Sequence, residues 1–337
     1  MFVLKSKIII GGFAFSGVNS IVIKKSIFSV HDSCTIKLPS VCRVKKKNSS
    51  GADFSTVSKL FNVGDKVSVN LGYNGALKNE FEGFVKSFNP MVPLEIECEG
   101  YIRNIRLNKN ISGYYNKISV KKLLELAVKD TGISLYVQDD ILLRNIQLDN
   151  FSGSDIISEI KKQCGGVIAI FFIEPKKIWC GLTYTPYTDG VDPFANGVAK
   201  YRLGFNCHRD NNLKLKSPLE PVQIIVNDVS STGHRLSVKS HTAATSKKKI
   251  SLQKILEESD KQKIANELQY EKNYSGYTGN IKGFLTPYVL PGYKVYILDN
   301  RYKELAGNYF VESIEVQYGT NGARRIVDIG PALSFKH

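Results

Sequence analysis

The sequence has few of the residues that most often carry out chemistry in proteins. Its 337 residues include five histidines, six cysteines and one tryptophan. The histidines are widely separated, and the adjacent Cys207 and His208 point to opposite faces of a strand. The chain also has no Walker loop, no G-x-S-x-G elbow and no H-E-x-x-H motif. We therefore predict a protein that is not an enzyme and that binds no metal and no cofactor.

Cysteine pairs and long apolar segments are also missing. No C-x-x-C pair occurs among the cysteines, which are Cys34, Cys42, Cys98, Cys164, Cys180 and Cys207. Disulfides and a zinc site are therefore not expected, and synthesis in a reducing compartment is the simpler interpretation. The apolar run 8–10 is short, and no stretch approaches the ~20 apolar residues of a membrane-spanning helix. We expect no membrane insertion.

Acidic residues are scarce relative to basic ones. The chain has 46 Lys and Arg against 31 Asp and Glu, which gives a net charge of +15. Two lysine-rich stretches are predicted to be loops and are candidates for contacting a partner: Lys45, Lys46 and Lys47, and Lys247, Lys248 and Lys249. Lysine provides a hydrated point charge and not a bidentate phosphate clamp. Solvated loops or acidic protein partners are therefore preferred to nucleic acid, which stays open as the alternative.

Strand patterns are abundant, and the clearest spans residues 63–99. Apolar and polar residues alternate over 66–71, which predicts a half-buried strand. Gly64 and Asp65 before this strand suit a tight turn. Two further strands follow, so the segment is predicted to form an antiparallel meander in a small barrel or sandwich.

The same pattern returns near the C-terminus. A glycine turn at 291–292 precedes an alternating strand, and Gly307 opens the return strand. Two copies of one β-domain are the preferred interpretation, and chance recurrence of glycine turns is the alternative. The positions predicted to be structural turns are Gly64, Asp65, Gly72, Gly83, Pro291, Gly292 and Gly307. Three such chains around an axis would present six similar domains.

Between the two β-domains, helical and strand patterns alternate. Helices are predicted over 120–129, capped by Ser119, and over 154–163, capped by Ser154, with a hairpin after them. A longer helix is predicted after a cap at Ser251. The predicted fold class is mixed and β-rich, with two β-barrel (tube-like) domains, an inserted small α/β domain and a helical excursion. The predicted boundaries are 1–108 for the first β-barrel domain, 109–200 for the α/β domain plus linker, 201–245 and 276–337 for the second β-barrel domain, and 246–275 for the helical insertion.

Several turn-and-strand motifs of both β-domains occur in a characteristic order and spacing. In the first domain they are Gly64-Asp65-x-Val67-x-Val69-x-Leu71-Gly72-Tyr73-x-Gly75, Phe81-x-Gly83-x-Val85 and Pro93-Leu94-x-Ile96-Glu97-Cys98-Glu99. In the second they are Leu290-Pro291-Gly292, Gly307-x-Tyr309-x-Val311 and Tyr318-Gly319-Thr320-Asn321-Gly322-x-Arg324. This order resembles the hub proteins of phage baseplates and contractile injection systems, including the late control protein D group. The chain departs from that family at Tyr293, where Asp is usual.

The resemblance implies a structural role. A homotrimer would form a ring of six barrel domains that joins a hexameric tail tube to a trimeric central spike and lines the channel. The implied partners are further copies of the chain, the tail tube protein, the spike protein and other baseplate or tape-measure proteins, with DNA only passing through. The implied location is the tail or baseplate of a virion or injection particle, after synthesis in the bacterial cytoplasm. Two alternatives stay open: a basic β-barrel protein that binds nucleic acid, and a cell-wall enzyme.

Overall fold

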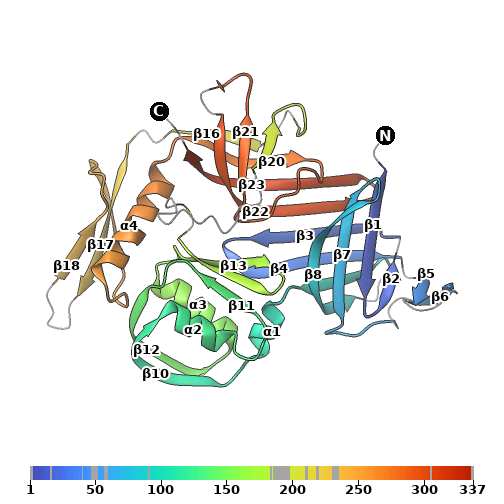
Figure 1. Cartoon of the computed structure of the whole chain (residues 1–337), viewed down its shortest axis with the longest axis horizontal. Coiled ribbons are helices and arrows are strands. Elements are labelled where there is room, and N and C mark those ends of the chain that lie inside the picture. Colours follow the sequence, from blue (N-terminus) through green and yellow to red (C-terminus); the bar gives the residue numbers. More distant parts are fainter. Residues whose placement is uncertain are drawn as a thin grey trace.

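The computed structural model shows an elongated molecule dominated by strands (Figure 1). It describes residues 3–15, 17–39, 41–46, 52–56, 60–89, 92–182, 184, 198–208, 212–217, 220–229, 235–303 and 306–334, without the side chains of 41–46, 52–56, 229, 235–236 and 333–334. The predicted class, β-rich with an inserted α/β domain, is confirmed.

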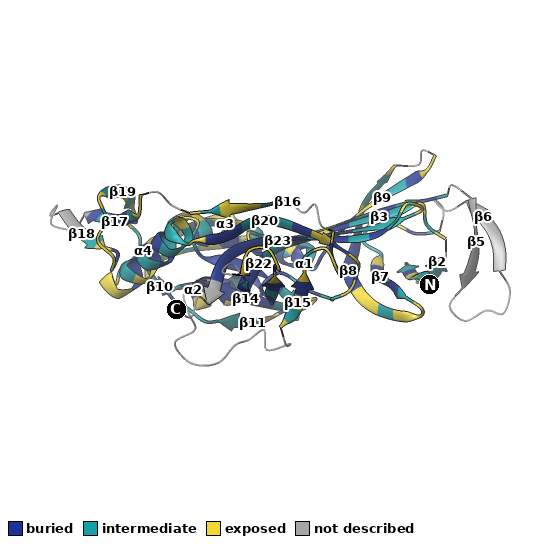
Figure 2. Cartoon of the chain, turned by 90° about the horizontal axis from the view of Figure 1, so that it is seen from above, coloured by how far each residue is buried: buried dark blue, intermediate teal, exposed yellow. Residues whose placement is uncertain are grey.

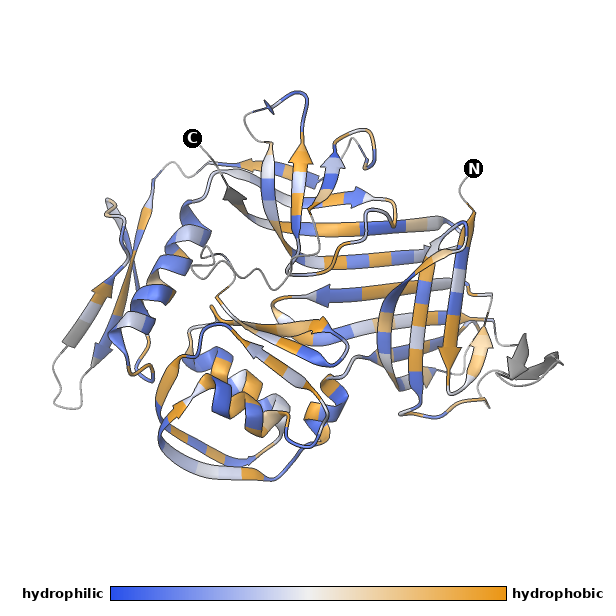
Figure 3. Cartoon of the chain, viewed as in Figure 1, coloured by the Kyte–Doolittle hydropathy of each residue, from blue (hydrophilic) through white to orange (hydrophobic). Residues whose placement is uncertain are grey.

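The first β-half comprises the strands before the first helix. They are β1 (Leu4–Ile10), β2 (Phe13–Phe15), β3 (Ser20–Ser26), β4 (Ser29–Leu38), β5 (Val41–Lys46), β6 (Ala52–Thr56), β7 (Lys66–Tyr73), β8 (Ala76–Asn89) and β9 (Leu94–Glu99). Their spatial order is β3-β4-β9-β8-β7-β1-β2-β5-β6. Apolar and polar residues alternate along them (Figure 3), which places residues such as Ile8, Ile36 and Val69 in the core.

The second β-half is built from the last strands and two short strands that precede them. They are β15 (Ala199–Arg202), β16 (Asn212–Lys216), β20 (Gly276–Gly283), β21 (Lys294–Leu298), β22 (Gly307–Gly319) and β23 (Gly322–Ser334). Because β22 pairs with β3, the two halves form one continuous sheet over one shared core (Figure 2). The described strand pairs follow an open path, and no closed barrel is found among them.

The two β-halves repeat one arrangement. The order β3-β4-β9-β8-β7 corresponds to β16-β20-β23-β22-β21. At the turn before β7, Gly64 N–H donates to the Val85 carbonyl at 2.8 Å, and Val85 donates back to the residue after the glycine at 2.9 Å. Gly292 and Val311 make the same two bonds before β21, at 2.8 and 2.9 Å. Because these bonds are made by the backbone, Tyr293 preserves the turn despite replacing the family's usual Asp.

Both copies also carry a β-bulge at the same place. The β8–β9 register shifts just before Ser87, and the β22–β23 register shifts just before Ser313. Ser87 then donates to Glu97 at 2.8 Å, and Ser313 donates to Asp328, the counterpart of Glu97. Chance recurrence of glycine turns would not reproduce the strand order, the turn bonds and the bulge together. The structure therefore supports a duplicated β-domain.

The α/β module connects the halves. Its elements are α1 (Ile102–Leu107), β10 (Ile111–Ser119), α2 (Val120–Ala127), β11 (Ser134–Val137), β12 (Leu142–Phe151), α3 (Gly153–Gln163), β13 (Ala169–Glu174) and β14 (Lys177–Gly181). Ser119 caps α2 as predicted. The predicted cap of α3 is wrong by two residues: Ser152 caps it, because Asp155 stands three residues later and completes a capping box.

The segment before β20 forms a separate layer of β17 (Val222–Val229), β18 (Arg235–Lys239), β19 (Ser246–Ser251) and α4 (Glu258–Asn273). The predicted helix is present as α4, but its predicted cap at Ser251 is wrong, because residues 246–251 pair in parallel with β17 and α4 begins after Glu257. β17 and β18 fall within the predicted second β-barrel domain, but they form a separate sheet with β19, in the order β18-β17-β19, and do not pair with β20–β23. The apolar side chains of this layer join the core of the α/β module.

Candidate functional site at the junction of the modules

A buried ion pair connects the two β-halves between β8 and β23. Arg325 is 0% exposed and Glu80 is 1% exposed, and the Arg325 Nη2 donates to Glu80 Oε1 at 2.6 Å. The other guanidinium nitrogens donate to the carbonyl oxygens of Val289 at 3.0 Å and Leu285 at 3.3 Å. Arg325 therefore fixes the loop that precedes β21 against the first half.

The α/β module contacts the second half through an aromatic cluster. Phe171 and Trp179 pack with Tyr184 and Phe310, and all four are buried. The Tyr184 hydroxyl donates to Glu312, and its N–H donates to Glu267 at 2.6 Å. Burial is the main cause that raises the pKa of Tyr184 and also that of Glu312, so a neutral phenol meets a carboxyl group held with little water.

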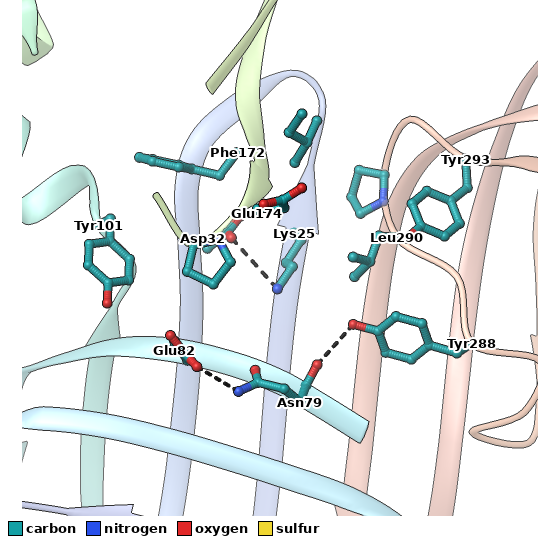
Figure 4. A pocket seen from close by; sticks show the side chains of 13 residues that line it. Lys25, Asp32, Asn79, Glu82, Tyr101, Phe172, Glu174, Tyr288, Leu290 and Tyr293 are labelled. Carbon is teal, nitrogen blue, oxygen red and sulfur yellow. Dashed lines mark hydrogen bonds and ion pairs between the residues drawn. The ribbon is translucent and has the colours of Figure 1, made fainter. Parts of the chain in front are cut away.

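The three modules enclose what we name the junction pocket, with a volume of about 400 Å³ (Figure 4). Side chains of the first β-half form its floor, the β13–β14 hairpin forms one wall and the loop before β21 forms the other. It is lined by Lys25, Asp32, Asn79, Glu82, Tyr101, Phe172, Ile173, Glu174, Pro175, Tyr288, Leu290, Pro291 and Tyr293. Its volume lies within the range of small-ligand sites.

Two hydrogen bonds shape one side of the pocket. Tyr288 donates its hydroxyl to the Asn79 carbonyl at 2.9 Å, and the Asn79 side chain donates to Glu82 at 2.8 Å. The Tyr288 bond holds the loop before β21 on β8, and the Asn79 bond to Glu82 orients side chains within β8. The pocket wall is therefore positioned by a contact between the halves and not by the loop alone.

A loose ion pair lies at the floor. The Lys25 Nζ and the Asp32 Oδ2 are 3.9 Å apart, and the two side chains are 16% and 14% exposed. This separation exceeds a hydrogen bond. Burial raises the pKa of Asp32 from its usual 3.8 to about 6, and the Lys25 ammonium opposes this shift. The attraction of the Lys25 ammonium group therefore only partly offsets the cost of removing the Asp32 carboxylate from water.

We expect Asp32→Asn to stabilise the protein at pH 8 by about 1–3 kcal/mol, because a pKa shift of two units corresponds to about 3 kcal/mol. Since the folded-state pKa is the higher one, the folded chain binds more protons between pH 4 and 6, and stability falls as pH rises through that window. The variant should lose that slope, measured by thermal unfolding at pH 4 and pH 8.

The matched control is Glu95→Gln, which alters an exposed carboxylate paired with Lys37 at 2.8 Å. Charged groups on the elements around Asp32 stay the same in both variants: Lys25, His31, Glu82, Lys86, Glu97, Glu99, Arg106 and Glu174. A stability loss for Asp32→Asn that is larger at pH 8 than at pH 4 would contradict the assignment.

The predicted structural turns divide into two kinds. Gly64 and Gly292 have φ of +92° and +88°, which favours glycine. Gly72 and Gly83 instead lie inside strands, where a Cβ would come within 2.0 Å of the Ala76 carbonyl oxygen and 2.2 Å of the Glu99 carbonyl oxygen. The other predicted turn residues are placed as follows: Asp65 stands after the first glycine turn, Pro291 lines the junction pocket and Gly307 opens β22.

The prediction of a basic loop at Lys247, Lys248 and Lys249 is wrong in its structure. These lysines lie in β19, an edge strand, and all three are exposed. The strand forms because β17 offers a parallel partner. Charged side chains on an edge discourage pairing with other chains. Lys45 and Lys46 lie in β5 with side chains outside the described residues, as is all of Lys47, and partner contact by either stretch stays a prediction.

The described residues hold neither a metal cluster nor a membrane-spanning helix. No group of three or more His, Cys, Asp or Glu side chains there could hold a metal ion. No helix in the same part of the chain is long and apolar enough to cross a membrane. The five cysteines whose side chains are described are buried thiols: Cys34, Cys98, Cys164, Cys180 and Cys207.

Comparison with known proteins finds this fold in several solved structures. No protein-family model and no curated protein matches the sequence. A tail protein from Neisseria meningitidis MC58 aligns with a TM-score of 0.63 over 97% of this chain and 96% of its own, at 14% identity. The 43 kDa tail protein of prophage MuSo2 from Shewanella oneidensis aligns with a TM-score of 0.64 over 98% of both chains, at 12% identity.

A third similar structure comes from a secretion machine. It is a component of the type VI secretion system of E. coli that is structurally similar to the T4 bacteriophage tail proteins gp27 and gp5. It aligns with a TM-score of 0.55 over 94% of this chain and 74% of its own, at 9% identity. The chain thus has the fold of phage tail proteins, and the resemblance to tail hub proteins is confirmed at the level of the fold.

Proposed function

We propose that this protein is a structural hub of a phage tail or a related injection machine, assembled as a homotrimeric ring and without catalytic turnover. The shared fold with tail proteins and a type VI secretion component supports the structural role. The duplicated β-half supports the ring, because three copies would contribute six similar units. Such a ring matches a hexameric tube on one side and a trimeric spike on the other.

The observation that best supports the proposed ring is that two strand edges have no partner among the described strands. Residues 313–319 of β22 pair with β3 inside the chain. The corresponding end of β8, residues 87–89, has β9 on one side and no described strand on the other. β16, the counterpart of β3, is likewise paired only with β20 among the described strands. A second copy can supply β16 to β8, as β3 is supplied to β22 within the chain.

The repeat also gives the register of this contact. The paired residues of the two halves can be matched strand by strand, starting from the equivalent turns at Gly64 and Gly292. In this match Lys24 corresponds to Lys214, and Glu315 corresponds to Asn89. Lys24 faces Glu315 inside the chain, with an ion pair of 3.4 Å. Lys214 of one copy should therefore face Asn89 of the next. Leu215, which is 57% exposed, would be covered by the neighbouring β8.

Light scattering of the full chain over a range of salt concentrations, with and without short DNA, tests this proposal. We expect a mass of three chains that is indifferent to DNA and to salt, because backbone pairing and apolar contacts hold the ring. A monomer that binds DNA and releases it as salt rises would overturn the proposal and favour the nucleic-acid alternative.

A cysteine pair reports on the contact itself. With Asn89→Cys and Lys214→Cys together, mild oxidation should give covalently linked chains on a non-reducing gel. Each single variant alone should stay unlinked, because its cysteine would face a lysine or an asparagine of the neighbour. A trimer that forms normally but does not cross-link would reject this register and keep the ring.

A further inference from the structure

The junction pocket offers charges of the opposite sign to the rest of the chain. Its lining includes the carboxylates of Asp32, Glu82 and Glu174 and one ammonium group, that of Lys25. The lining therefore has a net charge of −2, whereas the chain carries +15. Electrostatic complementarity favours a cation in this pocket, and it disfavours an anion.

Asp32 is the group that most needs a further partner. Its only ion-pair partner among the described residues is the Lys25 Nζ at 3.9 Å, and no hydrogen bond to its carboxylate is found there. The side chain is 14% exposed, and Asp32 lines the pocket. A mostly buried carboxylate without a hydrogen bond is unfavourable until a donor reaches it. A ligand with N–H groups would supply the hydrogen-bond donors that the Asp32 carboxylate lacks among the described residues.

The walls suit the rest of such a ligand. Tyr101, Tyr293 and Phe172 contribute aromatic surface, and Leu290 and Pro291 contribute aliphatic surface (Figure 4). Aromatic faces attract ammonium and guanidinium groups within about 6 Å. The chain already uses one of the pocket rings in this way, since the Lys176 Nζ lies 5.7 Å from the Tyr101 ring centroid.

The arrangement fits an organic cation better than a metal ion. The pocket carboxylates are not among any described cluster of three groups that could hold a metal. Glu82 is also engaged by the Asn79 amide at 2.8 Å, and Glu174 stands at the rim with a side chain 68% exposed. Dispersed carboxylates with aromatic and aliphatic walls match a charge carried on a hydrocarbon stem.

We propose that the junction pocket binds a primary ammonium or guanidinium group carried on an aliphatic stem. The cation enters between Asp32 and Glu82, and its stem lies against Leu290, Pro291 and Tyr293. This chemistry can come from a free diamine or from a lysine or arginine side chain of a neighbouring protein. The proposal does not depend on the trimer, because every lining residue belongs to one chain.

Isothermal titration of the full chain tests the proposal with three probes. They are cadaverine, the peptide acetyl-Gly-Lys-Gly-amide and the same peptide with its lysine Nε acetylated. We expect saturable binding of the first two with a dissociation constant of about 1 mM or below, typical of small ligands. The acetylated peptide keeps the stem and loses the charge, so it should bind at least about tenfold more weakly.

Variants show whether binding occurs in this pocket. Asp32→Asn and Glu82→Gln should each weaken binding at least about tenfold. Glu95→Gln, an exposed carboxylate outside the pocket, should leave it unchanged. Thermal unfolding of each variant checks the fold, and Asp32→Asn is expected to be at least as stable as the parent at pH 8.

The outcomes are distinct. Tighter binding of the lysine peptide than of cadaverine would identify a protein side chain as the source, and the reverse order would identify a free amine. The proposal is overturned if neither cation binds, if the acetylated peptide binds equally well, or if both pocket variants bind like the parent. A trimer that binds no cation would leave the proposed hub function standing, so the two failures can be told apart.

Discussion

Replacing Arg325 by methionine is expected to lower the free energy of unfolding by about 3–5 kcal/mol. The substitution leaves the Glu80 carboxylate, 1% exposed, buried without its cation. Burial already raises the pKa of Glu80, and Arg325 is the main group that opposes the rise. The carbonyl oxygens of Leu285 and Val289 would also lose their donors. Chemical denaturation at pH 7 measures the change.

A double-mutant cycle separates the ion pair from simple loss of packing. Glu80→Gln combined with Arg325→Met should recover part of the stability that Arg325→Met loses, because no unpaired charge stays buried. The matched control is Arg324→Met. Arg324 is half-buried, and its guanidinium lies 5.9 Å from the Phe284 ring centroid, so its loss should change stability by less than about 1 kcal/mol. Equal losses at positions 324 and 325 would contradict the assigned role of the pair.

Local sequence signals predicted the β-halves well. Alternation of apolar residues placed β7 and β21, and the glycine turns at Gly64 and Gly292 proved to have matching backbone bonds. These features depend on a few neighbouring residues, so a single sequence carries them. The bulges before Ser87 and Ser313 were not predicted, because a bulge depends on which strand lies alongside.

Features that depend on partners far away in the chain were missed. Residues 246–251 form a strand because β17 pairs with them, although their three lysines indicated a loop. Lys261 of α4 is 3% exposed because its ammonium group donates to the buried Asp228, 33 residues earlier in the chain, at 2.6 Å. Each outcome follows from a contact that local pattern does not encode.

The junction pocket lay beyond sequence reasoning for the same reason. Asp32 stood out in the sequence only as the sole acidic residue of the first 50. Asp32 and Lys25 lie in the β3–β4 hairpin, but the pocket that they line forms only when the β13–β14 hairpin and the loop before β21 are placed beside them. Arg325 and Glu80 are likewise ordinary strand residues until the fold buries them together.

Gly83 should tolerate no side chain. The cause is steric contact with neighbouring atoms and not the backbone conformation that a turn glycine would require. Gly83 lies inside β8, and its φ lies outside the left-handed region. A Cβ there would lie 2.2 Å from the Glu99 carbonyl oxygen and 2.8 Å from the Phe81 ring. Gly83→Val is expected to lower stability by at least about 3 kcal/mol, seen as loss of soluble protein or a lower unfolding midpoint.

The repeat explains why a glycine is needed at this position in one copy only. Phe81 corresponds to Gly307 of the second half, and Gly83 corresponds to Tyr309. Each half therefore has one glycine and one aromatic residue at these two positions, but in the opposite order. Phe81 and Tyr309 are both fully buried. In each copy one ring fills the space, and a second side chain has no room.

A matched control for Gly83→Val is Gly17→Val, because a Cβ at Gly17 would meet no atom within 4 Å beyond its chain neighbours and the φ of Gly17 is not left-handed. This control should fold and assemble as the parent does. Normal solubility, stability and mass for Gly83→Val would mean that β8 and β9 can separate at Glu99. The close strand contact next to the bulge would then not be a fixed part of the repeat, and the register inferred for the ring from that repeat would lose its support.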